Sequence, residues 1–323
     1  MKLNPQIILG SLIVIIAILT LIVFTTANRP KSNLLLTASE NKFKISFNIG
    51  ANNQKYFSEV LEKFSLPTTV KSGFEFQLDA TSSARLALIT PAEAELNFSP
   101  NKIRYKGEIS HELFPDELPI ENLTFPKTTR LVVFAPNFKE FLNTKMNLPS
   151  ELTTWINRTL INQGQYLVVG GQDSDFTIVF KSTNPDFESL KNLKQNGNSE
   201  PVYKEESEEN ITLHLLNLFA DKDGKQPTLA LFQIGQFIFL NSSQSAAQEM
   251  INAQKFPNLA IKFSALEKTK SASFAIYMDG SNDENFYNFI LGRQKNYVNQ
   301  LAKVKHFEFI LKGKRFSGLI NIE

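Results

Sequence analysis

Residues 43–50 read FKISFNIG, and a related stretch returns near the end of the chain, where residues 273–280 read SFAIYMDG. The first alternates strictly between apolar and polar residues, and both end in glycine. Segments with helical spacing, 51–61 and 281–291, come after them, and the two copies align without a gap. Alternation is typical of a half-buried strand, and apolar residues three and four apart indicate an amphipathic helix. The pattern predicts a strand–turn–helix unit that occurs twice.

Three further stretches between these copies have the same plan, with Asn, Ser or Pro at the turn: 131–146, 176–193 and 237–252. After the second copy, 304–311 and 316–322 are predicted to form a hairpin around Gly313. Alternating strands bury one face of a largely antiparallel sheet, and helices cover that face. The expected fold class is therefore α+β, with a single N-terminal transmembrane helix, a largely antiparallel sheet with covering helices, and an internal pseudo-repeat.

The transmembrane prediction comes from residues 7–24, an uncharged hydrophobic stretch of 18 residues. As a helix it would span roughly 27 Å, close to the hydrocarbon thickness of a bilayer. The alternative is a signal peptide cleaved after the small residues 25–27, but the apolar region of such a peptide is usually only about 7–15 residues long. We expect an uncleaved anchor.

Charges on the two sides of this stretch favour different orientations. Lys2 precedes it, while Arg29 and Lys31 come after it, which by itself favours a cytoplasmic C-terminal region. A single N-terminal anchor after a short tail usually exports the domain on its C-terminal side, and long domains translocate largely regardless of charge. We therefore expect a single-pass protein of the plasma membrane with its C-terminal domain extracytoplasmic.

The expected domain boundaries are set by the anchor, the repeat and three prolines between 115 and 126. The division is 1–28, cytoplasmic tail and anchor; 29–41, linker; 42–110, first α+β half; 111–127, proline-rich connection; and 128–323, second α+β region with the matching copy at 271–323.

Composition excludes several classes of protein. The net charge of +2 argues against a nucleic-acid binder, which would show a basic surface. The absence of cysteine excludes disulfides, a thiolate nucleophile and cysteine-based metal sites. The 28 phenylalanines against one tryptophan are explained either as core filling or as the lining of an apolar cavity.

No motif predicts a catalytic, cofactor-binding or metal-ligating residue, and no cofactor is expected. His111, His214 and His306 lack a ligand partner three or four residues away, and His214 falls in an alternating strand. Residues 221–224 (DKDG) resemble part of a calcium loop, but Phe232 stands where its final glutamate should be. The paired glycines within 169–173 predict a hairpin turn.

The polar residues 195–209 are predicted to be a solvated loop, because acidic residues crowd its end.

The middle of the chain, 125–277, resembles a domain-of-unknown-function family of bacterial single-pass membrane proteins. The resemblance lies in a Phe-Pro entry at 125–126, the Asn-Pro-Asp sequence at 184–186, and a hairpin of 229–234 with 237–240. It implies an anchored extracytoplasmic α+β domain in a bacterium and assigns no catalytic residue.

The function expected from these features is a non-catalytic, membrane-anchored binding or envelope-assembly module. Its expected partners are the lipid bilayer, through the N-terminal helix, and an envelope protein or an apolar ligand; no nucleic acid is expected. The first alternative is a carrier or sensor for an apolar ligand such as a lipid, and the second is an enzyme with a dispersed site. The sequence makes no prediction of oligomeric state.

Overall fold

The structure is a computed structural model of the 323-residue chain. It describes residues 32–39, 42–48, 54–63, 73–77, 91–99, 101–114, 117–136, 138, 150–159, 164–171, 175–182, 185–192, 203–208, 210–217, 228–256, 258, 260–261, 269–280 and 303–322. These residues fall into two compact units. We call residues 118–270 the inserted unit, because they interrupt the other, the split unit, whose described residues fall within 32–117 and 271–322.

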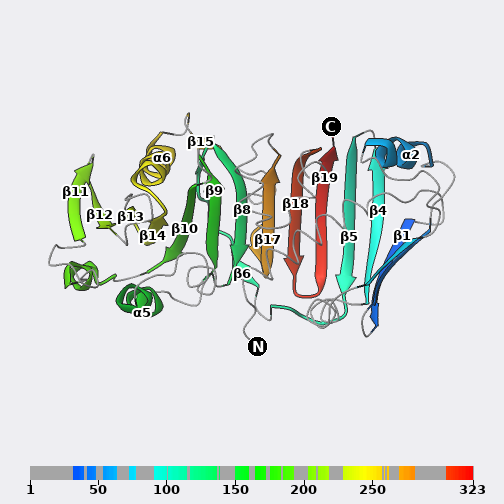
Figure 1. The fold of residues 1–323 in the computed structure, drawn as a ribbon, viewed down its shortest axis with the longest axis horizontal. Helices are drawn as coiled ribbons and strands as arrows, with labels where there is room; N and C mark the ends of the chain where they lie inside the picture. The colour runs from blue at the N-terminus through cyan, green and yellow to red at the C-terminus, as the bar shows by residue number, and fades with distance from the viewer. Residues whose placement is uncertain are drawn as a thin grey trace. The chain divides into compact units, whose positions relative to one another are not determined.

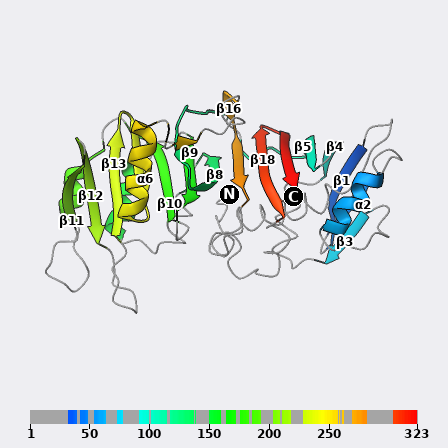
Figure 2. The ribbon, with the colours of Figure 1, turned by 90° about the horizontal axis from the view of Figure 1, so that it is seen from above.

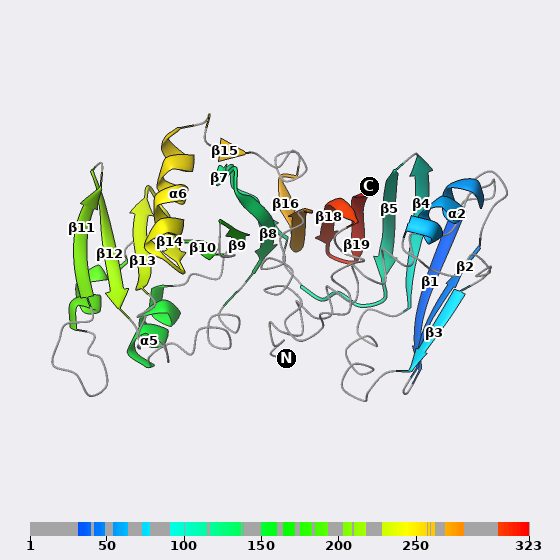
Figure 3. The same cartoon turned by 45° about the horizontal axis from the view of Figure 1, so that its top comes forward.

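The split unit contains antiparallel strands, of which three from the C-terminal part of the chain lie beside five from the N-terminal part (Figure 1). In sheet order its strands are β17 (Phe274–Asp279), β18 (Val304–Lys312), β19 (Arg315–Ile322), β5 (Lys102–Ile109), β4 (Ala92–Ser99), β1 (Ser32–Ser39), β2 (Lys42–Phe47) and β3 (Gly73–Gln77). The C-terminal hairpin β18–β19 thus pairs with the much earlier hairpin β4–β5. Helix α2 (Gln54–Lys63) lies near β1 and β4 (Figure 3), and the Lys63 ammonium donates to the Asn101 side chain in the β4–β5 turn at 2.9 Å.

One face of this sheet is apolar and buried, because side chains alternate along each strand. The buried residues of the central strands include Ile103, Tyr105, Phe316 and Ile320, whose neighbours along the strands point to the opposite face.

The strands of the inserted unit are also antiparallel, in the order β11 (Tyr203–Glu208), β12 (Ile211–Asn217), β13 (Thr228–Ile234), β14 (Phe237–Asn241), β10 (Asp175–Lys181), β9 (Gln165–Gly170) and β8 (Thr129–Ala135). Its central strands are buried on both faces: Ile178, Val179 and Phe180 are consecutive and all at most 1% exposed. Helix α6 (Gln244–Lys255) packs on β13, β14 and β10 (Figure 2). Its N-cap is Ser243, whose hydroxyl accepts from the Ala246 amide at 3.0 Å.

Two further helical elements of the inserted unit pack together, α5 (Ser150–Thr159) and the 3-10 helix η2 (Phe187–Asn192). Trp155 of α5 donates its indole N–H to the Asp186 carbonyl at 2.7 Å, just before η2. A short ladder of β7 (Phe125–Pro126) with β15 (Ala260–Ile261) also contacts α6. Strands β6 (Leu118–Pro119) and β16 (Ser271–Ala272) complete the described elements.

The expected α+β class is wrong, because the described residues form mainly antiparallel strands with few helices. Segment 186–193 was expected to be an α-helix, and it forms only the short 3-10 helix η2, in which the Asp186 side chain accepts from the Ser189 amide. Residues 203–208, expected in a solvated loop, form β11. Residues 32–39, in the expected linker, form β1 between β4 and β2. Most of the described residues therefore lie in strands, several of which are joined in hairpins by tight turns.

The expected transmembrane helix at 7–24 lies outside the described residues. Within the part of the chain that is described, none of the helices has both the length and the apolar character needed to cross a bilayer.

The two copies of the repeated stretch both contribute strands to the split unit. β2 pairs with β3, and β17 pairs with β18, in each case the next strand of its own copy. Residues 281–291, the expected second helix, lie outside the described residues, as does most of the helix expected within 138–146.

The predicted hairpins are confirmed. β18 and β19 meet at Gly313, β13 and β14 at Gly235, and β9 and β10 at Gly171, and all three glycines have positive φ. Such a conformation favours glycine, so the local turn chemistry fixes these connections.

Candidate functional site

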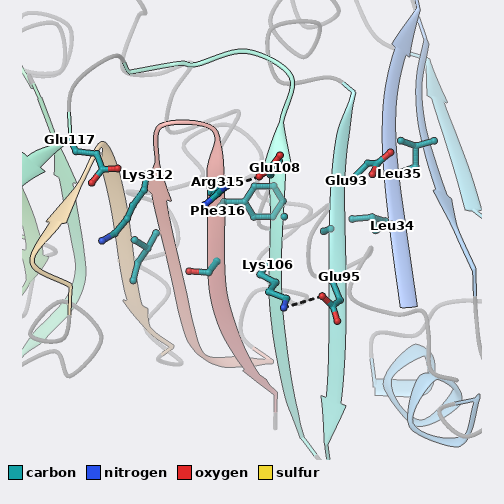
Figure 4. A pocket seen from close by; sticks show the side chains of 14 residues that line it. Leu34, Leu35, Glu93, Glu95, Lys106, Glu108, Glu117, Lys312, Arg315 and Phe316 are labelled. Carbon is teal, nitrogen blue, oxygen red and sulfur yellow. Dashed lines mark hydrogen bonds and ion pairs between the residues drawn. The ribbon is translucent and has the colours of Figure 1, made fainter. Parts of the chain in front are cut away.

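The polar face of the split-unit sheet is hollowed into a trough of about 880 Å³ (Figure 4). The trough crosses five neighbouring strands, β1, β4, β5, β19 and β18, at right angles to their direction. Its walls carry both acidic and basic side chains. The lining residues with charged side chains are Glu93, Glu95, Lys106, Glu108, Glu117, Lys312 and Arg315.

One row of side chains runs across the whole trough. Directly paired positions on successive strands place Leu35, Glu93, Glu108, Arg315 and Lys312 in this order on one face. Paired residues of antiparallel strands project from the same side of a sheet, so the row is fixed by backbone register. Its acids come from β4 and β5 and its bases from β19 and β18, which makes the row dipolar.

The two charged residues at the centre of the row, Glu108 and Arg315, neutralise each other. Arg315 Nε lies 3.0 Å from a Glu108 carboxylate oxygen, and both side chains are largely exposed, at 83% and 64%. In the next row, Lys106 pairs with Glu95 at 3.1 Å. Exposed pairs of this kind contribute only about 0–1 kcal/mol to stability. The charges are therefore available for recognition at little cost to the fold.

The outer charges of the row are not neutralised. Within the described part of the chain, the side chains of Glu93 and Lys312 make no hydrogen bond or ion pair, although both line the trough. Leu35, beside Glu93, is one of the large apolar side chains exposed on the described surface, at 37%. The trough thus offers an anionic end with an apolar neighbour, a self-paired centre and a cationic end. Glu117 also lines the trough and accepts from the Ser271 hydroxyl at 2.8 Å.

A second cluster of polar side chains lies in the inserted unit, around His214 of β12. The imidazole stacks on Phe187 of η2, with ring centroids 4.1 Å apart and planes at 9°. Tyr203 of β11 lies between His214 Nδ1, at 2.6 Å, and a Glu205 carboxylate oxygen, at 2.5 Å. Because a carboxylate only accepts, the Tyr203 hydroxyl donates to Glu205, and His214 Nδ1–H donates to the Tyr203 oxygen.

The ionisation of this cluster is determined by its surroundings. Burial lowers the pKa of His214, against an opposing effect of Glu205. Burial and the hydrogen bond to Glu205 raise the pKa of Tyr203, and the same hydrogen bond lowers the pKa of Glu205. At neutral pH His214 is therefore neutral and Glu205 ionised. These hydrogen bonds join the edge strand β11 to β12, and the stacking of Phe187 on His214 holds η2 against them. The cluster therefore stabilises this part of the inserted unit.

The other two histidines have different surroundings. His306 of β18 lies 2.8 Å from a Glu308 carboxylate oxygen and packs edge-on against Tyr277, while His111 is exposed. His214 and His306 belong to different units, and His111 is not brought to either cluster. No group of three or more His, Asp or Glu side chains suited to a metal occurs among the described residues. Residues 221–224, the calcium-like sequence, lie outside them.

Sequence reasoning missed the trough completely. The available signal was local: Glu93 and Glu95 alternate with alanines, and Lys106 and Glu108 flank Gly107 eleven to fifteen residues later. Such alternation marks the polar face of a hairpin. The partners Arg315 and Lys312 could not be found this way, because β19 pairs with a strand some 200 residues earlier in the chain.

Comparison with known proteins gives little further information. No family model and no curated protein matches the chain. Among solved structures, the chain is similar to crystal form I of TP0453, with 11% sequence identity over 60% of this chain and 75% of that one and a TM-score of 0.36.

Proposed function

We propose that the chain is a non-catalytic binding module, tethered to the bacterial plasma membrane by residues 7–24, that holds a partner protein of the envelope in the trough of the split unit. The supporting observation is the dipolar row across the trough, whose outer charges, Glu93 and Lys312, are unmatched within the described residues. A groove that carries both positive and negative side chains complements a polypeptide segment, because polypeptides carry charges of both signs at close spacing.

The trough suits an apolar ligand poorly. Half of its 14 lining residues carry charged side chains, which an acyl chain would desolvate without compensation. The large phenylalanines with the least exposure, among them Phe134, Phe180 and Phe307, fill the two cores. This supports core filling as the explanation of the phenylalanine excess.

A site-specific photo-crosslinker at Ser317, which lines the trough, tests the proposal in cells that produce the full chain. We expect a discrete protein adduct that disappears when Glu93→Lys and Lys312→Glu are introduced. The matched control carries the crosslinker at Arg104, an exposed residue of β5 outside the trough lining. An adduct with lipid, or an adduct unchanged by the two substitutions, would contradict the proposal.

A further inference from the structure

We infer that the trough recognises an extended polypeptide segment that crosses the strands and carries a basic and an acidic side chain four residues apart. This inference rests on the proposed function and specifies the partner's chemistry. The basic side chain lies against Glu93 and the acidic one against Lys312.

The charges fix the ends of the segment. Glu93 on β4 and Lys312 on β18 are the two charged residues of the row that have no counter-charge within the described residues. Between them, Glu108 and Arg315 already neutralise each other at 3.0 Å. A ligand charge over the centre would compete with that pair, whereas a charge at either end gains a new partner. The preferred ligand therefore has charges at its ends and none between them.

The spacing of the strands sets the distance between the ligand charges. From β4 to β18 the sheet crosses three strand spacings, because β5 and β19 lie between. At about 4.8 Å each, this is roughly 14 Å. An extended chain advances about 3.4 Å per residue, so four residues also cover roughly 14 Å. Side chains at i and i+4 of an extended chain project from the same side, and both can face the sheet.

The same geometry disfavours smaller zwitterions and polyanions. The phosphate and amine of a lipid headgroup, or the termini of a free amino acid, are only a few atoms apart and cannot reach both Glu93 and Lys312. A nucleic-acid strand would place phosphates against Glu93, Glu95 and Glu108. Leu35 adds an apolar contact for the aliphatic stem of a lysine or arginine at the anionic end.

Labelled synthetic peptides and the full chain test the inference by fluorescence anisotropy. The probes are Thr-Lys-Thr-Ser-Thr-Glu-Thr, in which the charges are four residues apart, and permutations with the glutamate two or three residues after the lysine. We expect the first peptide to bind about tenfold more tightly than the permutations, with the preference weakening as salt rises. Equal binding of all three would overturn the inference.

A charge substitution gives a sharper test than loss of binding. Lys312→Glu makes both ends of the row acidic, so this variant should prefer a peptide with lysine at both positions over the lysine–glutamate peptide. Arg104→Glu makes the same change of charge on β5 outside the trough lining and should keep the original preference. Circular dichroism confirms that each variant folds. An unchanged preference in Lys312→Glu would refute the inference.

The peptide result separates the two proposals. If the crosslinked protein is lost on charge substitution but no peptide spacing is preferred, the binding function stands and the extended four-residue arrangement is wrong. If neither a crosslinked protein nor a bound peptide is found, both are wrong.

Discussion

Tyr105 and Gly318 form a directly opposed pair on the buried face where β5 meets β19. The tyrosine ring lies over the glycine, and its hydroxyl donates to the Glu308 carbonyl of β18 at 2.6 Å. Burial raises the pKa of Tyr105, so the hydroxyl remains a donor. A side chain at Gly318 would overlap both that hydroxyl and the carbonyl. In the neighbouring pair the strands exchange roles: the ring of Phe316 on β19 lies over Gly107 on β5.

Removing parts of this contact should destabilise the split unit selectively. Tyr105→Phe loses one buried hydrogen bond, at a cost of about 0.5–1.5 kcal/mol. Gly318→Ala forces the ring aside, at a cost of about 1–3 kcal/mol. Urea unfolding monitored by circular dichroism measures both. Trp155, the only tryptophan, lies in the inserted unit, so its fluorescence serves as an internal control. A Gly318→Ala protein with unchanged unfolding would show that the ring contact does not matter.

His214 makes the stability of the inserted unit depend on pH. Its pKa in the fold is lowered, chiefly by burial, from the usual value of 6.5, while Glu205 and Glu188 oppose this and Lys191 adds to it. The unfolded chain therefore binds more protons than the fold below about pH 6.5, and stability must fall as the pH falls through this range. The urea midpoint reported by Trp155 should decrease between pH 7.5 and 5.5.

The variant His214→Phe keeps the stacking on Phe187 but cannot titrate. We expect its urea midpoint to change less over the same pH range than that of the unsubstituted protein, even though it loses the bond to Tyr203. Identical pH dependence in the two proteins would assign the effect to another group.

At the scale of elements, β11 shows how a polar strand protects a sheet edge. Its sequence, YKEESE, pairs with β12 and ends the strand order of the inserted unit. An edge strand exposes unpaired backbone groups, and charged side chains discourage pairing with another chain. Lys204 and Glu206 contribute such charges and also pair with each other.

Replacing these charges with β-forming apolar residues should cause self-association. For Lys204→Val with Glu206→Val, we expect an increase in mass with concentration in sedimentation velocity, because the edge gains strand propensity and loses its repulsion. The control, Lys204→Gln with Glu206→Gln, removes the charges without adding apolar surface and should keep the mass of the unsubstituted protein. A valine variant with unchanged mass would disprove a protective role.

A comparison of β11 with the hairpins shows which elements can be predicted from the sequence. Hairpins at Gly235 and Gly313 were predictable, because turn chemistry is local and positive φ favours glycine. β11 was not, because its residues lack the apolar alternation of a buried strand and its place depends on β12. The trough could not be predicted from the sequence either. Glu93 and Lys312 lie in one row only because β19 pairs with β5, a contact between distant parts of the chain.

At the scale of the whole molecule, the chain folds as one unit inserted into another. The inserted unit is continuous, whereas the split unit takes strands from both sides of it. The two ends of the split unit are close at the insertion point, where the Ser271 hydroxyl donates to the Glu117 carboxylate at 2.8 Å. The ends of the inserted unit are close as well, since the Ile120 amide donates to the Lys270 carbonyl at 3.1 Å. Insertions with adjacent ends are readily tolerated.

The insertion should therefore be removable. We expect that joining Glu117 to Ser271 through about four Gly and Ser residues leaves a folded split unit, because a short loop closes at low entropic cost. Circular dichroism should show a strand-rich, cooperatively unfolding protein, and the trough should keep its peptide preference. The released fragment 118–270 should fold separately, with the emission of Trp155 typical of a buried indole.

A chain truncated after 270 provides the contrast to this deletion. It keeps the inserted unit but lacks β17, β18 and β19. Of these, β18 and β19 supply one wall of the trough, and β19 is the partner of β5. It should keep the Trp155 signal and lose peptide binding. If deletion of 118–270 unfolded the remaining strands, the two units would have to be regarded as one cooperative body, and the binding site would depend on both.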